Sequence, residues 1–216
     1  MICRSWLIGG LFAGFAAALA LPAGVQAKKK ADDGWVQLFN GKDSTGWKLH
    51  PQANKETKWE VADGWLVGSG QASMLYSERD DFANFHCKVT AKINDKGNSG
   101  QYFRATFVPG FVTGIEAQLN ATHRDPIRTG SLYFPKIKEL LVLNDAPHKP
   151  DEEFTQEVVA IGPKITVWVN GKKTVQWVDP DYAKRSKGHF ALQQHDPGSR
   201  ISFKKIEVKE LPATKE

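Results

Sequence analysis

The sequence predicts an all-β protein built as an antiparallel β-sandwich. Short segments in which apolar residues occupy alternate positions recur along the chain, and turn residues separate them. No long segment has the three-to-four-residue apolar spacing of an amphipathic helix. Many short strands at regular spacing are typical of a sandwich or jelly roll.

The first 27 residues have the features of a cleaved secretory signal. Arg4 precedes an apolar run at residues 7–21, which is short for a membrane span of roughly 20 residues with suitable flanks. The residues Val25-Gln26-Ala27 then give the small-residue pattern of a signal-peptidase site. No twin arginine is present, so we expect export by the general secretory route to the periplasm or the extracellular space.

Beyond the signal, the sequence predicts a flexible basic tail at residues 28–34, one domain at 35–211 and a C-terminal tail at 212–216. A mature chain of this length can bury a full core as a single domain. Cys87 is the sole cysteine after the signal, so no internal disulfide can form. It alternates with Phe85 and Val89, which predicts a buried structural thiol. The oligomeric state stays open.

The charge pattern argues against nucleic acid as a partner. The chain has 29 Lys and Arg against 24 Asp and Glu, a formal charge of +5, and part of the excess lies in Lys28-Lys29-Lys30. The other basic residues are spread among acids and form no basic helix or RNA-reading motif. After signal cleavage we therefore expect neither a nucleic-acid nor a membrane partner.

Tight turns divide the first half of the domain into strands. Asn40-Gly41 separates expected strands at 36–38 and 47–49, and Asp63-Gly64 joins 59–62 to 65–67 because Asp-Gly tolerates the positive φ of a hairpin turn. Residues 85–93 form the clearest strand, with apolar residues at the odd positions. Three other strands are expected at 73–77, 98–104 and 114–118.

The second half contains one long irregular segment and then more strands. Residues 122–153 include several prolines and no clear strand, and a segment of that length is usually functional or disordered. Because residues 140–143 are apolar, we expect the segment to pack as a rim or lid. Lys204 and Lys205 interrupt an alternating segment, which predicts a β-bulge. The expected strands are 157–161, 165–169, 174–177, 189–194 and 201–208.

Polar side chains gather on one face of the two strands at 98–104 and 114–118. Residues two apart on a strand share a face, so Asn98 and Arg104 point the same way, and Glu116 shares a face with Gln118. A face this polar, backed by an apolar one, is suited to a polar ligand. The alternative is a solvated sheet face whose Arg–Glu pair contributes only ~0–1 kcal/mol.

A second polar pair lies near the C-terminus. If Phe190 and Leu192 face the core, Gln193 and His195 share the opposite face. Histidine exchanges a proton near neutral pH, so His195 is a candidate acid or base. A single Gln-x-His pair is weak evidence, and it gains weight by repeating the pattern of the earlier strands.

Several motifs occur together in order along the domain. They include Leu38-Phe39-Asn40-Gly41-Lys42-Asp43 with Gly46-Trp47, Trp59-Glu60-Val61 with Asp63-Gly64, Asn98-Ser99-Gly100 with Arg104, Gly114-Ile115-Glu116-Ala117-Gln118, Thr129-Gly130-Ser131-Leu132-Tyr133, Trp168-Val169-Asn170-Gly171 and Leu192-Gln193-Gln194-His195. On these motifs the chain resembles the 3-keto-disaccharide hydrolase domain family over nearly all of residues 35–211. The resemblance implies a concanavalin-like jelly roll, which agrees with the expected strands, and a sugar as the small-molecule partner.

Two positions depart from the family pattern. Phe154-Thr155 stands where the family usually has Trp-Asn, and Phe203-Lys204-Lys205-Ile206 stands where it usually has Phe-Arg-Asn-Ile. Lysine lacks the bidentate fork of arginine, so any ligand contact made by that arginine is altered here. These departures bear on the identity of the sugar and the linkage more than on the fold.

The chemistry expected of this face differs from that of a conventional glycosidase. Such enzymes place two carboxyl groups about 5–5.5 Å or about 6.5–9.5 Å apart. Here Glu116 is followed on its face by Gln118 and Asn120, whose amides cannot act as nucleophile or acid. A 3-keto sugar instead needs one base, one proton donor and hydrogen-bond donors for an enolate oxygen, because the ketone acidifies the hydrogen on carbon 2.

The resemblance therefore implies cleavage of 3-keto-glycosides or 3-keto-disaccharides by elimination and hydration. Glu116 and His195 would divide the roles of base and acid in either order, and Arg104 would polarise the keto group. The substrate-binding candidates are Asn98, Gln118, Tyr133 and Gln193. The alternative is a non-catalytic carbohydrate-binding module of the same fold. No cofactor is predicted, and the use of a divalent metal stays open.

Overall fold

The computed structural model describes residues 33–50, 52–53, 55–108, 113–133 and 142–213. The expected signal at 1–27 and residues 28–32 of the expected tail at 28–34 lie outside the described residues, as does the end of the C-terminal tail. Within the described residues the chain forms strands β1 to β14 and one short 3₁₀ helix, η1 (Tyr182–Lys184). This confirms the predicted all-β class.

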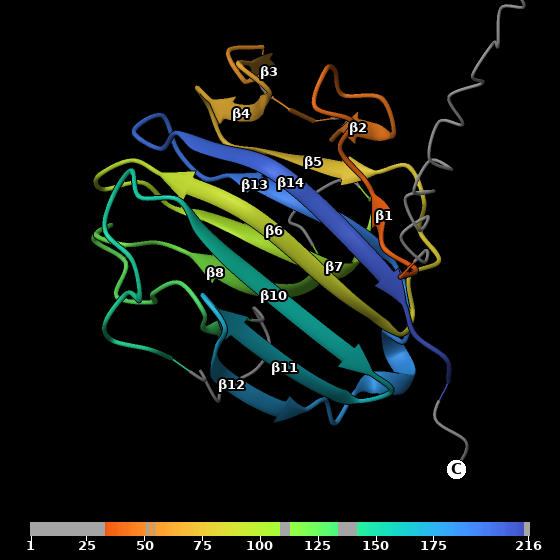
Figure 1. Ribbon diagram of the computed structural model, residues 1–216. Coiled ribbons are helices and arrows are strands. Elements are labelled where there is room, and N and C mark those ends of the chain that lie inside the picture. The colour runs from red at the N-terminus through yellow and green to blue at the C-terminus, as the bar shows by residue number, and fades with distance from the viewer. Residues whose placement is uncertain (1–32, 51, 54, 109–112, 134–141, 214–216) are drawn as a thin grey trace, which may run out of the picture. The chain divides into compact units, whose positions relative to one another are not determined.

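Two antiparallel sheets make up the fold, which confirms the predicted β-sandwich (Figure 1). The larger sheet has the order β12-β11-β10-β6-β14-β4-β3, and β1 pairs with β14. Its strands are β12 (Lys172–Val178), β11 (Lys164–Val169), β10 (Phe154–Ile161), β6 (Phe85–Ile93), β14 (Ile201–Glu210), β4 (Trp65–Ser69), β3 (Lys58–Ala62) and β1 (Val36–Gln37).

The smaller sheet has the order β2-β5-β13-β7-β8-β9. Its strands are β2 (Trp47–Leu49), β5 (Ser73–Ser77), β13 (His189–Gln194), β7 (Ser99–Thr106), β8 (Thr113–Leu119) and β9 (Leu132–Tyr133). Strand β9 was not expected, and it lies inside the segment 122–153, in which the sequence shows no clear strand. Two residues are too short to show an alternating pattern. The predicted lid also includes residues 134–141, which are outside the described part of the chain.

The core lies between the two sheets, and the alternation of each strand determines which side chains enter it. Strand β6 alternates buried and half-buried residues along its whole length, as the sequence predicted. Cys87 is buried in this core, where burial raises the pKa of its thiol to about 12. The thiol also accepts a hydrogen bond from Nε2 of Gln101 at 3.4 Å. These features confirm that Cys87 is a buried structural residue.

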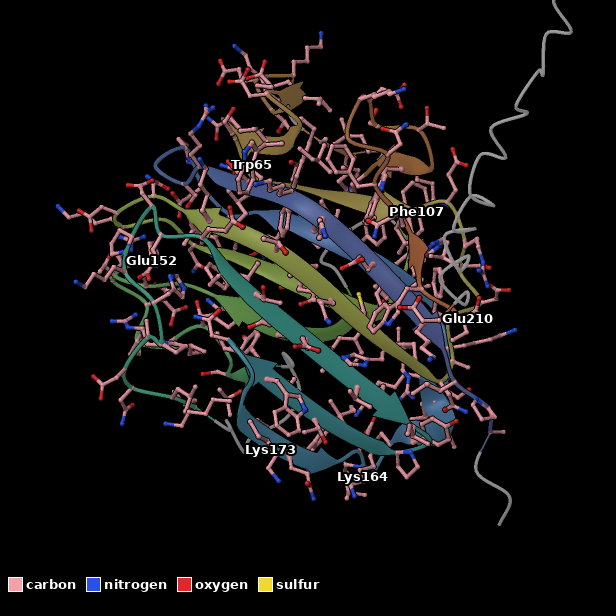
Figure 2. The ribbon with its side chains drawn as sticks, viewed as in Figure 1. Trp65, Phe107, Glu152, Lys164, Lys173 and Glu210 are labelled. Carbon is pink, nitrogen blue, oxygen red and sulfur yellow. The ribbon has the colours of Figure 1, made fainter. Side chains whose placement is uncertain are left out.

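The larger sheet turns polar side chains to the solvent at its edge and on its outer face. Lys164 and Lys173 project from the edge formed by β11 and β12 (Figure 2). The register of β14 against β6 shifts between Phe203 and Lys205, so the predicted bulge is present.

Among the described residues, no helix is long and apolar enough to cross a membrane.

Candidate functional site

A pocket of about 470 Å³ lies on the face of the smaller sheet that points away from the core. Neighbouring side chains on the same strands separate the two faces: Ala117 and Leu192 belong to the core, whereas Glu116 and Gln193 line the pocket. Strands β5, β7, β8, β9 and β13 all contribute to its wall. The lining includes His50, Met74, Asn98, Tyr102, Glu116, Gln118, Asp125, Ile127, Tyr133, Gln193 and His195.

Six of the seven candidate residues named from the sequence meet in this pocket. They are Asn98, Glu116, Gln118, Tyr133, Gln193 and His195. The described part of the segment 122–153 contributes Asp125, Ile127 and Tyr133 to the wall. The grouping follows from the shared sheet, because β8, β7 and β13 are direct neighbours.

Arg104 is the candidate that lies elsewhere, so the prediction that it shares this face is wrong. Strand β7 contains a bulge between Phe103 and Thr106, and Arg104 adopts a φ of 51° there. The bulge breaks the two-residue alternation and turns Arg104 away from the pocket. One nitrogen, Nη2, donates to the carbonyl oxygens of Ala83 at 2.8 Å and Gly162 at 2.9 Å.

Two glycines make room for this bulge. A Cβ at Gly114, opposite the bulge on β8, would lie 2.9 Å from the Cβ of Ala105. A Cβ at Gly188, just before β13, would lie 2.6 Å from the carbonyl oxygen of Ala105. The guanidinium of Arg104 also lies 4.9 Å from the ring centre of Tyr182 in η1. Arg104 therefore makes its contacts outside the pocket, with the carbonyls of Ala83 and Gly162 and the ring of Tyr182.

Glu116 is a buried carboxyl on β8, with 4 % of its surface exposed. Burial raises its pKa to about 8, although the hydroxyl of Tyr102 donates a 2.7 Å hydrogen bond to Oε2. A carboxyl with this pKa carries its proton at neutral pH for most of the time, so Glu116 is suited to act as a general acid.

A glycine on the neighbouring strand gives this carboxyl its space. Gly100 lies on β7 beside the pair formed by Tyr102 and Glu116, which are direct cross-strand neighbours. A Cβ at position 100 would lie 2.1 Å from Oε1 of Glu116. A side chain at position 100 is therefore incompatible with the observed position of the carboxyl.

Amide side chains surround the carboxyl and offer hydrogen bonds to a polar ligand. Nε2 of Gln193 donates to the hydroxyl of Tyr102 at 3.2 Å, which in turn donates to Glu116. Oε1 of Gln193 is buried and has no hydrogen-bond partner among the described residues. Nε2 of Gln118 donates to Oδ1 of Asn98 at 2.8 Å. An unpaired buried acceptor such as Oε1 of Gln193 is suited to receive a sugar hydroxyl.

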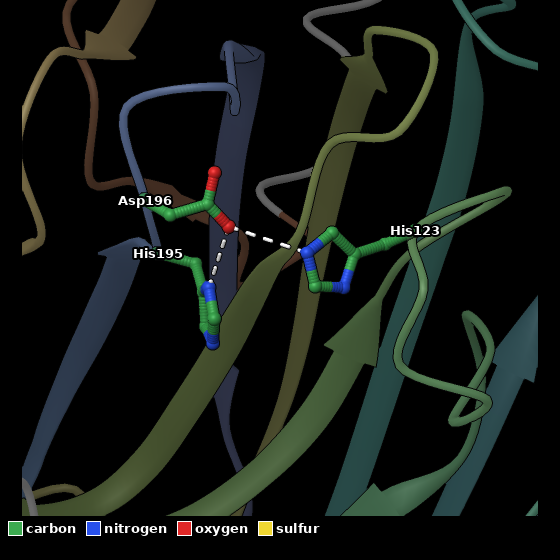
Figure 3. A group of neighbouring side chains, drawn as sticks. All are labelled: His123, His195 and Asp196. Carbon is green, nitrogen blue, oxygen red and sulfur yellow. Dashed lines mark hydrogen bonds and ion pairs between the residues drawn. The ribbon is translucent and has the colours of Figure 1, made fainter.

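His195 follows β13 at the edge of the pocket and belongs to a group of three polar side chains (Figure 3). Its Nδ1 lies 2.8 Å from Oδ2 of Asp196, and Nε2 of His123 lies 3.3 Å from the same oxygen. No described residue forms a hydrogen bond with Nε2 of His195. Burial lowers the pKa of His123.

Histidine and aspartate are residue types that bind divalent metals. One ligand atom from each of the three residues lies within 4.8 Å of the others, so by distance alone the group could hold a metal ion. The second nitrogen of a metal-bound histidine usually donates a hydrogen bond. Here Nδ1 of His123 instead accepts one from the amide of Asp125 at 3.1 Å. Neutral His123 therefore carries its proton on Nε2, toward Asp196, and a metal at Nε2 would require it to give up the Asp125 bond. As arranged, the group is held by the hydrogen bond between His195 and Asp196 and by the contact of His123 with the same carboxylate.

Several residues in or beside the pocket were missed by the sequence prediction. Asp125 and Ile127 line the pocket, and His123 contacts Asp196 beside it. All three come from the long segment, whose path cannot be derived from alternation. Asp196 was missed although it starts the turn sequence Asp196-Pro197-Gly198-Ser199, because a turn aspartate is common without any role in a site.

Comparisons with known proteins find a matching family model and one curated relative, both named for 3-keto sugars. A family model described as a 3-keto-alpha-glucoside-1,2-lyase-like domain matches residues 34–209. A 3-keto-disaccharide hydrolase from Bacteroides thetaiotaomicron is 28% identical over 83 residues, which is 34% of this chain and 28% of that protein. The match thus spans little more than a quarter of the length of this curated relative.

Solved structures share the sandwich fold. A candidate glycosyl hydrolase from Parabacteroides distasonis has a TM-score of 0.64 at 24% identity, covering 87% of this chain and 99% of that one. A carbohydrate binding module from Bacillus subtilis has a TM-score of 0.57 at 17% identity, covering 76% and 95%. A further Bacillus subtilis protein, described as having a galectin-like fold, has a TM-score of 0.61 at 12% identity, covering 76% and 89%. At these identities the likeness concerns the fold, and it agrees with the predicted jelly roll.

Proposed function

The chain belongs to the 3-keto-alpha-glucoside-1,2-lyase-like domain family, and from that premise we propose that it cleaves the glycosidic bond of 3-keto-glycosides by elimination followed by hydration. The observation that carries this proposal is the buried carboxyl of Glu116, whose pKa is raised to about 8, in the same pocket as the imidazole of His195. One group can give a proton at neutral pH while the other accepts one.

The first step removes the hydrogen on carbon 2 of the sugar, which the neighbouring ketone acidifies. Nε2 of His195 accepts this proton, and the electron pair of the C–H bond forms the enolate of carbons 2 and 3. The enolate oxygen needs hydrogen-bond donors. Because Arg104 lies outside the pocket, this role passes to neutral groups, namely the amides of Asn98 and Gln118 and the hydroxyl of Tyr133.

The second step breaks the bond between carbon 1 and the glycosidic oxygen. The enolate electrons form the double bond between carbons 1 and 2, and Glu116 gives its proton to the departing oxygen. The products are an unsaturated 3-keto sugar and a free alcohol. Water then adds to carbon 1, the Glu116 carboxylate accepts a proton from that water, and His195 returns a proton to carbon 2. The sum of these steps is hydrolysis.

The test is to incubate the purified chain with 3-keto-trehalose and 3-keto-glucosides in heavy water, with and without a chelator. Elimination and hydration should place solvent deuterium on carbon 2 of the product, whereas direct hydrolysis should leave that hydrogen in place. Glu116→Gln should lower turnover ~10²–10⁴-fold and keep most of the sugar affinity, because the amide keeps the shape of the carboxyl.

Glu60→Gln is the matched control, because Glu60 is exposed on β3 of the other sheet. It should keep wild-type turnover. A wild-type protein that binds these sugars and never releases product would instead be a non-catalytic carbohydrate-binding module, and the proposed reaction would be wrong. Loss of turnover with the chelator alone would assign a metal to the reaction.

We also propose that the protein acts after export, since residues 1–27 have the composition of a secretory signal. Cell fractionation and N-terminal sequencing of the mature protein test this. A chain starting at Lys28 in the periplasm or the medium is the expected result, and an uncleaved cytoplasmic chain would contradict it.

A further inference from the structure

The carboxylate of Asp196 joins two imidazoles at the edge of the pocket. Its Oδ2 lies 2.8 Å from Nδ1 of His195 and 3.3 Å from Nε2 of His123, and Figure 3 shows both contacts meeting at this one oxygen. His195 lines the pocket directly. Asp196 thus lies between a side chain that can reach a ligand and one that is buried behind it.

A tight turn between β13 and β14 fixes the position of this carboxylate. The amide of Ser199 donates to the backbone oxygen of Asp196 at 2.9 Å, which closes a turn with Pro197 at its second position. The amide of Gly198 donates to Oδ1 at 2.9 Å. Nε2 of Gln194 holds the backbone oxygen of Asp196 at 2.7 Å. The carboxylate therefore has little freedom to rotate away from the two histidines.

The hydrogen bonds around Asp196 define where each proton lies. Burial raises the pKa of Asp196, but the hydrogen bonds from His195 and Gly198 outweigh it and leave the pKa below its ordinary value. Asp196 is therefore an acceptor at neutral pH: Nδ1 of His195 donates a hydrogen bond to it, and Nε2 of His123 lies at ion-pair distance, 3.3 Å, from the same oxygen. In His123 the amide of Asp125 occupies Nδ1 as a donor, so Nε2 bears the hydrogen. In His195 the hydrogen is on Nδ1.

We propose that Asp196 and His123 are positioning residues that hold the proton of His195 on Nδ1 and so present its Nε2 lone pair to the pocket. Without a partner at Nδ1, a neutral imidazole distributes its proton between both nitrogens. The carboxylate selects one form and fixes the ring plane, and His123 holds the carboxylate from the other side. The inference rests on the proposed function in one respect, the role of His195 as the base.

The first experiment determines which ring nitrogen of His195 carries the proton, and it needs no substrate. Two-bond proton–nitrogen correlation spectra of ¹⁵N-labelled protein near neutral pH separate the two forms of each ring, and the spectrum of His195→Gln assigns the signals of His195. The expected result is a wild-type His195 with its proton on Nδ1. Asp196→Asn should convert it to a mixture of both forms. A wild-type His195 with its proton on Nε2 overturns the inference.

The second experiment reads turnover of a 3-keto-glycoside. Asparagine also forms this kind of turn, so Asp196→Asn keeps the loop. The expected result is a fall in kcat of ~10²–10⁴-fold with little change in KM, by analogy with the aspartate that orients the histidine of a catalytic triad. His123→Gln should lower kcat by a smaller factor. Asp63→Asn, in the exposed turn between β3 and β4, is the control and should keep wild-type kcat.

The two experiments separate the inference from the proposed function. A wild type with its proton on Nδ1 and no turnover supports the proton placement and overturns the proposed function. Turnover in Asp196→Asn equal to that of Asp63→Asn overturns the positioning role, even if the spectra change. A loss of kcat together with a mixed proton signal supports both.

Discussion

Gly100 and Glu116 occupy neighbouring strands so closely that a Cβ on the glycine would lie 2.1 Å from Oε1 of the carboxyl. The contact is between a backbone position and the reacting group proposed for the site. It therefore offers a way to displace Glu116 without changing the residue itself.

Gly100→Ala should lower kcat by at least ~10²-fold, because the methyl group forces the carboxyl and its Tyr102 hydrogen bond out of place. The measurement is kcat and KM with a 3-keto-glycoside, together with the melting temperature. Gly68→Ala is the matched control, since a Cβ at this β4 glycine meets the Trp59 ring at 2.9 Å in the other sheet. It should lower the melting temperature and keep kcat. Equal turnover in the two variants would contradict the proposed role of Glu116.

The contribution of Glu116 to the stability of the protein should fall as the pH rises from about 4.5 to about 8. The folded state keeps the proton of Glu116 up to about pH 8, whereas the unfolded state loses it near the ordinary value of 4.5. Above both values this difference amounts to about 5 kcal/mol at most. Glu116→Gln lacks this titration, so its unfolding free energy relative to the wild type should increase across the window. Urea unfolding at pH 5 and pH 8 measures it, and Glu60→Gln should show no such change.

Activity should decrease at alkaline pH. If Glu116 is the acid, turnover falls as the pH passes about 8, because the proton needed by the leaving group is lost. If Glu116 were the base, turnover would instead rise through the same pH. The pH profile of kcat, measured from pH 6 to pH 10 on a 3-keto-glycoside, separates the two roles. A profile that rises through pH 8 would reverse the assignment of Glu116 and His195.

Arg104→Met should destabilise the fold and leave turnover within about two-fold of the wild type. The carbonyls of Ala83 and Gly162 would lose their shared donor, which costs about 1–3 kcal/mol when buried groups are left unpaired. Thermal unfolding and kcat are the two measurements. A large loss of kcat with unchanged stability would contradict this prediction and indicate that Arg104 takes part in catalysis.

Much of the fold and most of the site followed from alternation together with the family resemblance. Glu116 and Gln118 share the pocket because β8 is regular where they lie, and Gln193 and His195 share it because Gln193 is in β13 and His195 directly follows the end of that strand. Burial of Cys87 and the bulge at Lys204 and Lys205 followed from the same rule. A two-residue period is a local property, and short regular strands express it fully.

The rest depended on contacts that local patterns do not contain. The bulge at Arg104 depends on Gly114 and Gly188, which come from two different neighbouring strands or their ends. The contact between Asp196 and His123 joins a tight turn to the long segment after β8. Strand β9 pairs through two residues only. Each of these is decided by the tertiary arrangement rather than by the residues next to it.

The bulge in β7 also affects how relatives of this chain are compared. Two residues, Arg104 and Ala105, stand opposite Gly114, so one more residue is present here than in a regular strand. In a homologue without that extra residue, the arginine aligned with Arg104 would point toward the sugar, and its neighbour would point into the core. Identity at this alignment column is therefore no guide to shared chemistry. The glycines at positions 114 and 188 are the markers that show which of the two forms a given homologue has.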